Sequence, residues 1–242
     1  GLSLLDTAGK AVRFQIAMRE DKPKIFFQTG LSPRQTQTFK MVRNAKQEMP
    51  ASDLVCINEG GVILLGNSQT GVKIPADEIG AANGPILGIR MISGRWIGAG
   101  ELTLKSKLMK FTAVIKEQGP VFAEVECSYF FENGKSWLIR FRLTANEPAV
   151  RISESCDMAD GSLWKLNCSA NFAPDAVCCR NTMPATGSVQ PNCLAIYDFI
   201  EGAEAAQLTP WPAWHLQRIG AHLAIFKTPQ GKTFIRKGKD YI

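Results

Sequence analysis

Two tryptophans stand three residues apart in the segment Pro210-Trp211-Pro212-Ala213-Trp214-His215, and a histidine follows the second. Proline restricts the backbone on both sides of Trp211, so we expect the two indoles to present stiff aromatic faces. Sugars pack their C–H surfaces on such rings, and His215 can bond a hydroxyl or act as a general base near neutral pH. The segment predicts a carbohydrate platform. The alternative is that both tryptophans close the end of a core and His215 is a structural hydrogen-bonding residue.

A second aromatic and cationic group occurs at Gly94-Arg95-Trp96. An exposed indole beside a guanidinium can hold a sugar ring together with its carboxylate or sulfate. A tight turn explains the glycine equally well. Further along, Asn171 and Asp175 follow a predicted strand and would lie at the mouth of the fold, unless Pro174 and Asp175 form an ordinary turn.

If the chain is an enzyme, β-elimination from a uronate is the reaction that its residue types fit best. That reaction needs a base, for which His215 and Tyr197 are the candidates, and a cation such as Arg218 to neutralise the carboxylate. The sequence contains these residues without showing that they meet. A glycosidase with paired carboxylates is less favoured, because Glu124 and Glu126 are expected to have arginine partners on a strand face.

Cysteine and histidine spacing argues against a metal site, and we expect no cofactor. The seven cysteines include no C-x-x-C pair, and His215 and His222 are the only histidines. The residues around Cys127 and Cys168 are mostly apolar, so buried free thiols are expected, with one or two disulfides as the alternative.

The net charge of +6 has a basic cluster near the C-terminus and another at Lys105, Lys107 and Lys110. No recognisable nucleic-acid-binding module accompanies these clusters, so nucleic acid is not favoured as a partner. A solvated basic face or an acidic polysaccharide such as a uronate or sulfated glycan fits the charge better.

The elements that must position these residues are strands. A chain of 242 residues allows one large domain or two small ones, and it contains no uncharged apolar run long enough for a membrane span. Helical periodicity is nearly absent, and its best window, Glu201–Gln207, is short. An antiparallel β-sandwich is therefore predicted. Its strand-like runs are Ala11–Met18, Lys24–Thr29, Gln35–Val42, Val62–Leu65, Gly71–Ile74, Ile86–Ile92, Lys110–Lys116, Val150–Ser153, Trp164–Ser169, Leu194–Ile200, Leu223–Lys227 and Thr233–Lys237.

One hairpin can be predicted in full register. A two-residue Asn133-Gly134 loop would pair Cys127 with Arg140 and mix the apolar and polar faces. A three-residue loop with Gly134 in the left-handed conformation keeps every pair alike in character. Its pairs are Tyr129 with Trp137, Cys127 with Ile139, Val125 with Phe141, Glu126 with Arg140 and Glu124 with Arg142.

A boundary is predicted in the polar stretch Lys46–Asp53, which separates residues 1–46 from a sandwich domain at 54–242. The first piece is too small to bury a good core alone, so its strands are expected to dock on the sandwich or on a domain outside this sequence. The chain begins with Gly1 and has no leader-like segment, which is expected of a processed chain or of a piece of a larger protein.

The run Gly61–Pro75, in which Asn67 joins two strand-like segments, resembles the opening hairpin of galactose-mutarotase-like supersandwich domains. Two later segments, Gly84–Gly98 and Gly119–Pro148, resemble the same kind of domain in large bacterial polysaccharide-processing proteins of lyase or hydrolase type. The likeness covers roughly residues 54–172. It implies a supersandwich fold and binding of an extended carbohydrate, with periplasmic or secreted localisation, and it assigns no catalytic residue.

The sequence thus favours a polysaccharide-binding β-sandwich domain of a larger carbohydrate-active protein. Its alternatives are a polysaccharide lyase or glycoside hydrolase that acts on an acidic glycan, and a structural module without a ligand. The expected contacts are Trp211, Trp214, His215, Arg95, Trp96 and Asn171.

Overall fold

The structure is a computed structural model that describes residues 1–43, 48–91, 94–132 and 134–156. Beyond these it describes the backbone of six strands: β16 (Leu163–Asn167), β17 (Ala176–Thr182), β18 (Gln190–Asp198), β19 (Gly202–Gln207), β20 (Trp214–Ile219) and β21 (His222–Lys227). Trp211 and Asn171 lie outside the described residues, as does the predicted strand Thr233–Lys237.

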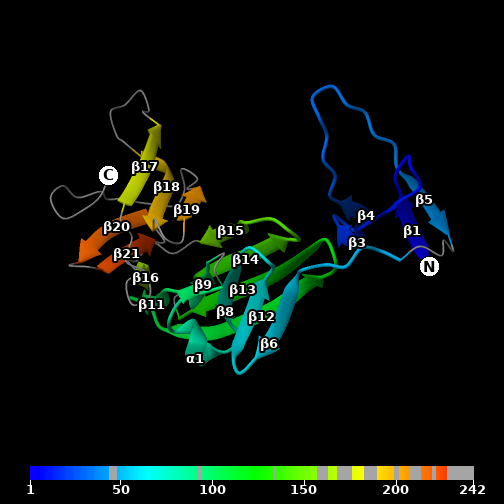
Figure 1. Cartoon of the computed structure of the whole chain (residues 1–242). Coiled ribbons are helices and arrows are strands. Elements are labelled where there is room, and N and C mark those ends of the chain that lie inside the picture. Colours follow the sequence, from blue (N-terminus) through cyan, green and yellow to red (C-terminus); the bar gives the residue numbers. More distant parts are fainter. Residues whose placement is uncertain are drawn as a thin grey trace.

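Strands dominate the described part of the chain, and every strand pairing within it is antiparallel (Figure 1). The prediction of an all-β, sandwich-like fold is confirmed. The described residues contain one short helix, α1 (Glu78–Ala81), which begins where the Asp77 carboxylate accepts a hydrogen bond from the Gly80 N–H at 2.8 Å. No helix among the described residues has the length and apolar character that crossing a membrane requires.

Two sheets share the main core. One has the order β10-β9-β8-β7-β6 and the other β12-β13-β14-β15. Their inward side chains, from Ile63 and Ile74 on the first sheet to Val125 and Phe141 on the second, form one buried apolar cluster. The strands are β6 (Val55–Glu59), β7 (Val62–Gly66), β8 (Gly71–Pro75), β9 (Gly88–Arg90), β10 (Trp96–Ile97), β12 (Leu108–Gln118), β13 (Phe122–Phe131), β14 (Ser136–Thr144) and β15 (Val150–Cys156).

The hairpin β13–β14 has the predicted register in all five pairs, from Glu124 opposite Arg142 to Tyr129 opposite Trp137. Gly134 has a φ of 73°, and its N–H donates to the Phe131 carbonyl at 3.0 Å. The alternation of buried and exposed residues along both strands excludes any one-residue shift.

Two segments differ from the sequence pattern. In the short window with the best helical periodicity, residues 202–207 form strand β19, which pairs with β18 from Cys193 opposite Gln207 to Asp198 opposite Gly202. Pairing to a neighbouring strand overrides the weak helical preference of this alanine-rich segment. The run Gln35–Val42 is a strand only in β5 (Lys40–Arg43), because Gln35 and Gln37 hold the preceding loop through their side chains.

The remaining described strands form smaller sheets. β2 (Ala11–Val12), β1 (Leu2–Leu5) and β5 make one, and β3 (Phe14–Arg19) pairs with β4 (Lys22–Phe27) in another. β11 (Ala99–Thr103) joins β16, β21 and β20, while β17, β18 and β19 form a separate sheet.

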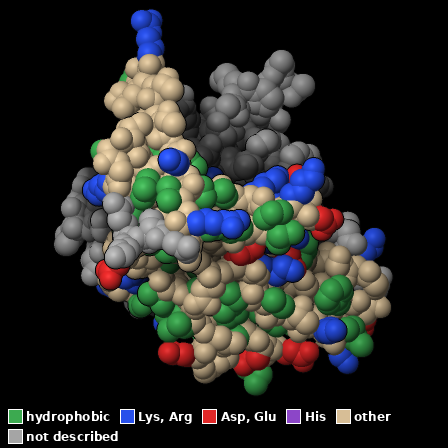
Figure 2. Space-filling model, turned by 90° about the vertical axis from the view of Figure 1, so that its right-hand side faces the viewer, with side chains coloured by type: hydrophobic (Ala, Val, Ile, Leu, Met, Phe, Trp, Pro, Cys, Tyr) green, Lys and Arg blue, Asp and Glu red, His purple; other side chains and the backbone are tan. Residues whose placement is uncertain are grey.

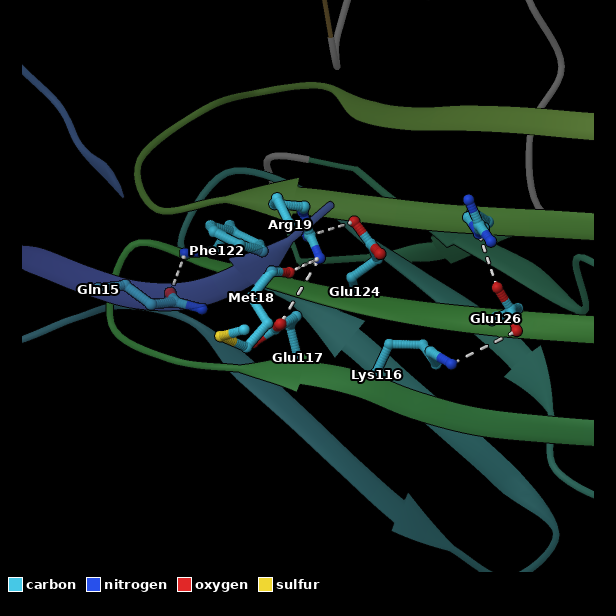
Figure 3. A network of polar contacts seen from close by, with 9 residues as sticks. Gln15, Met18, Arg19, Lys116, Glu117, Phe122, Glu124 and Glu126 are labelled. Carbon is cyan, nitrogen blue, oxygen red and sulfur yellow. Dashed lines mark hydrogen bonds and ion pairs between the residues drawn. The ribbon is translucent and has the colours of Figure 1, made fainter. Parts of the chain in front are cut away.

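The hairpin β3–β4 lies on the outer face of the sheet β12-β13-β14-β15, which we call the long sheet (Figure 3). Phe26 packs edge-on against Phe122 at a centroid distance of 5.1 Å. The Gln15 side-chain carbonyl accepts hydrogen bonds from the Val121 and Phe122 N–H groups at 3.2 and 3.0 Å. These contacts attach the hairpin β3–β4 to the sandwich.

Cys56 and Cys127 are buried free thiols, as predicted for these two positions. Burial, reinforced by the Glu126 charge, raises the pKa of Cys127 to about 12, and burial also raises the pKa of Cys56. Both thiols are therefore neutral at physiological pH and serve as small apolar core groups.

Candidate functional site

The proposed catalytic residues fall on two different sheets. His215 and Arg218 lie on β20, whose neighbour is β21, whereas Tyr197 lies on β18 between β17 and β19. Trp214 begins β20 opposite Lys227. The described backbone therefore does not place Tyr197 in the same sheet as His215.

Trp96 is the predicted contact whose side-chain surroundings the structure describes in detail. It begins β10 and lies opposite Arg90 of β9, while its neighbour Ile97 points into the core. Because strand residues alternate between faces, Trp96 and Arg90 share the outer face of the five-stranded sheet. The adjacent Arg95 is exposed, and its carbonyl accepts a hydrogen bond from the Met91 N–H at 2.8 Å in the turn that contains Gly94.

Glycines form the floor beneath the Trp96 indole. A Cβ on Gly71 would lie 3.3 Å from the indole Cη2 atom, and one on Gly88 would lie 3.7 Å from Cε3. Both glycines occupy outer-face positions of β8 and β9. The indole therefore lies across the backbone of two strands, in a place that side chains at 71 and 88 would otherwise fill.

Two cations border this ring. The Lys73 ammonium lies over the indole, 4.7 Å from the ring centroid, which is a cation–π contact. Arg90 donates through Nη2 to the carbonyl oxygens of Asn67 and Thr70, the latter at 3.0 Å. These bonds fix the guanidinium in one orientation next to Gly71. A Cβ added at Gly71 would lie 3.3 Å from the Arg90 Nε atom. We call Trp96, Lys73, Arg90, Gly71 and Gly88 the indole site.

The turn that holds Arg90 is itself fixed by Asn67. The buried Asn67 side chain accepts from the Gln69 and Thr70 N–H groups, both at 2.9 Å, and donates to the Thr144 and Glu147 carbonyls at 3.0 and 2.7 Å. All of its hydrogen-bonding capacity is used, so the β7–β8 turn is tied to the end of β14. The turn therefore forms a rigid support for Arg90.

Asp53 anchors the same turn from the other side. Its carboxylate accepts hydrogen bonds from the Ser68 hydroxyl at 2.6 Å, the Ser68 N–H at 3.0 Å and the Asn146 N–H at 3.1 Å. Partial burial acts to raise the pKa of Asp53, but the bonds from Ser68 and Asn146 outweigh it and lower this pKa. The carboxylate is thus ionised at all but acidic pH.

Sequence reasoning identified Trp96 but missed Lys73 and Arg90 as its neighbours. Lys73 is 23 residues away along the chain, and only the pairing of β8 with β9 and of β9 with β10 brings it beside the indole. A usable signal was present in the alternating segment Gly71-Val72-Lys73-Ile74. Gly71 and Lys73 lie on one face of the strand, and the buried Val72 and Ile74 lie on the other. Among the described residues no group of three or more histidine, cysteine and carboxylate side chains can hold a metal ion.

The indole site offers an apolar ring beside two positive charges, of which the Arg90 guanidinium is fixed by hydrogen bonds. Such a site can hold a flat, partly apolar ligand that carries an anionic group. Comparison with known proteins gives no relative, since no protein-family model and no curated protein sequence matches this chain.

Proposed function

We propose that this chain is a carbohydrate-binding β-sandwich domain that holds an acidic polysaccharide at the indole site. The observation that carries the proposal is the Trp96 ring laid over a glycine floor with the Lys73 ammonium 4.7 Å from its centroid. A sugar packs its C–H face on the indole in place of the Lys73 ammonium, and its carboxylate or sulfate pairs with the displaced Lys73 and with Arg90. This arrangement supplies binding and contains no general acid or base.

The proposal includes a relationship to galactose-mutarotase-like supersandwich domains. It is supported by the position of Asn67, which joins β7 to β8 and is buried at the sandwich end. A bacterial, periplasmic or secreted protein that processes polysaccharides would be the natural setting for such a domain, with Trp211, Trp214 and His215 as further contacts along an extended ligand.

Calorimetric titration with three oligosaccharides of equal length tests this function. An oligouronate, a sulfated oligosaccharide and a neutral oligoglucan are compared on the native chain and on the variants Trp96→Ala and Lys73→Gln. We expect Trp96→Ala to weaken binding of the acidic ligands at least tenfold, because the stacking surface is lost. Lys73→Gln should weaken acidic ligands about fivefold and leave any neutral ligand unchanged.

The matched control is Phe130→Ala, which removes an exposed aromatic ring from the other sheet. Circular dichroism melts establish that each variant is folded. Acidic-glycan binding that survives Trp96→Ala, or that falls equally in Phe130→Ala, would rule out the indole site as the binding surface. Release of unsaturated uronate ends in the same samples, abolished by His215→Ala, would instead make the chain a lyase.

A further inference from the structure

The Lys73 ammonium occupies the place in the indole site where a sugar would stack. It lies 4.7 Å from the centroid of the Trp96 ring, which is within the range of a cation–π contact. Among the described residues no carboxylate forms an ion pair with Lys73. Attraction to the ring thus holds this charge in place, and a sugar that stacks on the ring must displace it.

The stem of Lys73 reaches the ring because Gly88 leaves room for it. Strand pairing places Gly88 of β9 directly opposite Lys73 of β8, while Trp96 comes from β10 on the other side of β9. A Cβ on Gly88 would lie 3.7 Å from both the Lys73 Cδ atom and the Trp96 Cε3 atom. The two side chains therefore converge over a position that a larger residue would fill.

The two cations of the indole site are held differently. Arg90 donates through Nη2 to the Asn67 and Thr70 carbonyls, so its guanidinium keeps one orientation. Lys73 carries its ammonium on a flexible stem and is half-buried, and within the described part of the chain this ammonium donates no hydrogen bond. It can therefore leave the ring without breaking a hydrogen bond, whereas Arg90 cannot turn in the same way.

An acidic sugar and a neutral sugar compete with Lys73 on different terms. The carboxylate or sulfate of an acidic sugar gives the displaced ammonium a new ion-pair partner beside Arg90. A neutral sugar brings no charge, so the cation–π attraction of Lys73 to Trp96 is lost without replacement. An attraction of this strength corresponds to binding that is about twofold to fivefold weaker.

Charge on the face of the molecule that Figure 2 presents does not form a single basic patch. Basic and acidic side chains lie among one another there, although the chain has a net charge of +6. Charges of mixed sign attract an acidic glycan only weakly from a distance. The preference for acidic over neutral sugars is therefore expected from contacts within the indole site and not from this face.

We propose that Lys73 is a selectivity gate of the indole site. Its side chain covers the Trp96 ring in the free chain and yields the ring to sugars that carry an anionic group. The inference rests on the proposed glycan-binding function, and it adds the residue that sets the preference between acidic and neutral sugars. Because the gate is closed before any ligand arrives, its closure can be measured without a glycan.

Nuclear magnetic resonance of the whole chain tests the closed state. Reductive methylation with isotopically labelled formaldehyde marks the lysine ammonium groups and keeps their charge. The Lys73 signal, identified by its loss in Lys73→Ala, should be shifted upfield by the indole, and this shift should vanish in Trp96→Ala. A Lys73 signal that coincides with that of the exposed Lys10 would overturn the gate, whatever the chain binds.

Calorimetric titration tests the selection. A neutral oligoglucan and an oligouronate are compared on the native chain, Lys73→Ala and Lys73→Gln. Lys73→Ala uncovers the ring, so it should bind the neutral ligand about twofold to fivefold more tightly than the native chain and the oligouronate more weakly. Lys73→Gln keeps an amide N–H over the ring and removes only the charge, so its neutral binding should equal that of the native chain.

The matched control is Lys10→Ala, which removes an exposed lysine of the N-terminal strands and should change neither titration. Neutral binding that is no tighter in Lys73→Ala than in the native chain, or that tightens equally in Lys10→Ala, would overturn the gate. A native chain that binds neither ligand, together with a Lys73→Ala variant that binds the neutral one, would support the gate. That same result would refute the acidic-glycan binding of the proposed function, so the two failures are distinguishable.

Discussion

Arg19→Gln is the substitution that most directly tests how the hairpin β3–β4 is attached to the sandwich. Arg19 reaches from β3 to two carboxylates of the long sheet, with Nη2 3.1 Å from Glu124 and Nη1 3.5 Å from Glu117 (Figure 3). These glutamates lie directly opposite each other on β12 and β13, where like charges destabilise a sheet. The arginine therefore pairs with both carboxylates and offsets their mutual repulsion.

The loss of stability expected for Arg19→Gln follows from how far Arg19 and its partners are exposed to solvent. Arg19 is 28% exposed, so its charged hydrogen bond to Glu124 is worth about 1.5 kcal/mol, less than a buried one and more than a surface ion pair. Its guanidinium also lies 5.5 Å from the Phe122 ring centroid, which adds about 0.5 kcal/mol. Arg19→Gln should thus lower the free energy of unfolding by about 2 kcal/mol.

Urea denaturation measures this loss, and Arg140→Gln is the matched control. Arg140 forms a 2.6 Å ion pair with Glu126 on the same sheet but is 51% exposed, so its loss should cost only about 0.5 kcal/mol. In a Glu117→Gln background the cost of Arg19→Gln should fall below about 1.5 kcal/mol, because the repulsion with Glu124 is gone. Equal costs for the two arginines, or strict additivity with Glu117→Gln, would refute the reasoning.

Hydrogen exchange provides a local measure of the same attachment. The Val121 and Phe122 amides donate to Gln15 only while the hairpin is seated on the long sheet. In Arg19→Gln these two amides should exchange about tenfold faster, while amides in the centre of β14 remain unchanged. Unchanged exchange at Val121 and Phe122 would show that Arg19 does not hold the hairpin in place.

Three further predictions concern the sandwich. Gly100→Ala should lower the free energy of unfolding by about 3 kcal/mol, measured by thermal or urea denaturation, because the new Cβ would collide with the backbone carbonyl of Asn83. In the control Gly30→Ala, the new Cβ has no atom within 4 Å, so the free energy of unfolding should change by less than about 0.5 kcal/mol. The lowered pKa of Asp53 contributes stability that is present above its unfolded value of about 3.9 and lost as pH falls through the folded value, so Asp53→Asn should flatten the pH dependence of the unfolding free energy below about pH 4. The pKa of Cys127 is raised to about 12 in the folded chain, against about 8.5 in the unfolded chain. The resulting stability is complete below about pH 8.5 and is lost as the pH rises toward 12. Cys127→Ala should therefore reduce the fall in the free energy of unfolding that is measured between about pH 8 and 10.5.

Alternation of apolar and polar residues was enough to predict strands and, for β13–β14, their register. In that hairpin a one-residue shift would place Arg140 opposite Cys127, and the cost of burying the charge excludes it. Alternation did not indicate the strand at residues 202–207, where small residues fit helix and strand about equally and pairing with the neighbouring strand β18 decides.

The indole site shows what required tertiary structure. Sequence patterns identified Trp96 as an aromatic residue beside an arginine and a glycine turn, which is a local property of adjacent residues. The neighbours of its ring come from β8 and β9, and they meet it only because three strands pair in order β8, β9, β10. Sequence alone determined which residues alternate into the core, since burial follows the two-residue period of a strand. Strand pairing decided which outward residues share a site, because hydrogen bonds between distant segments set that proximity.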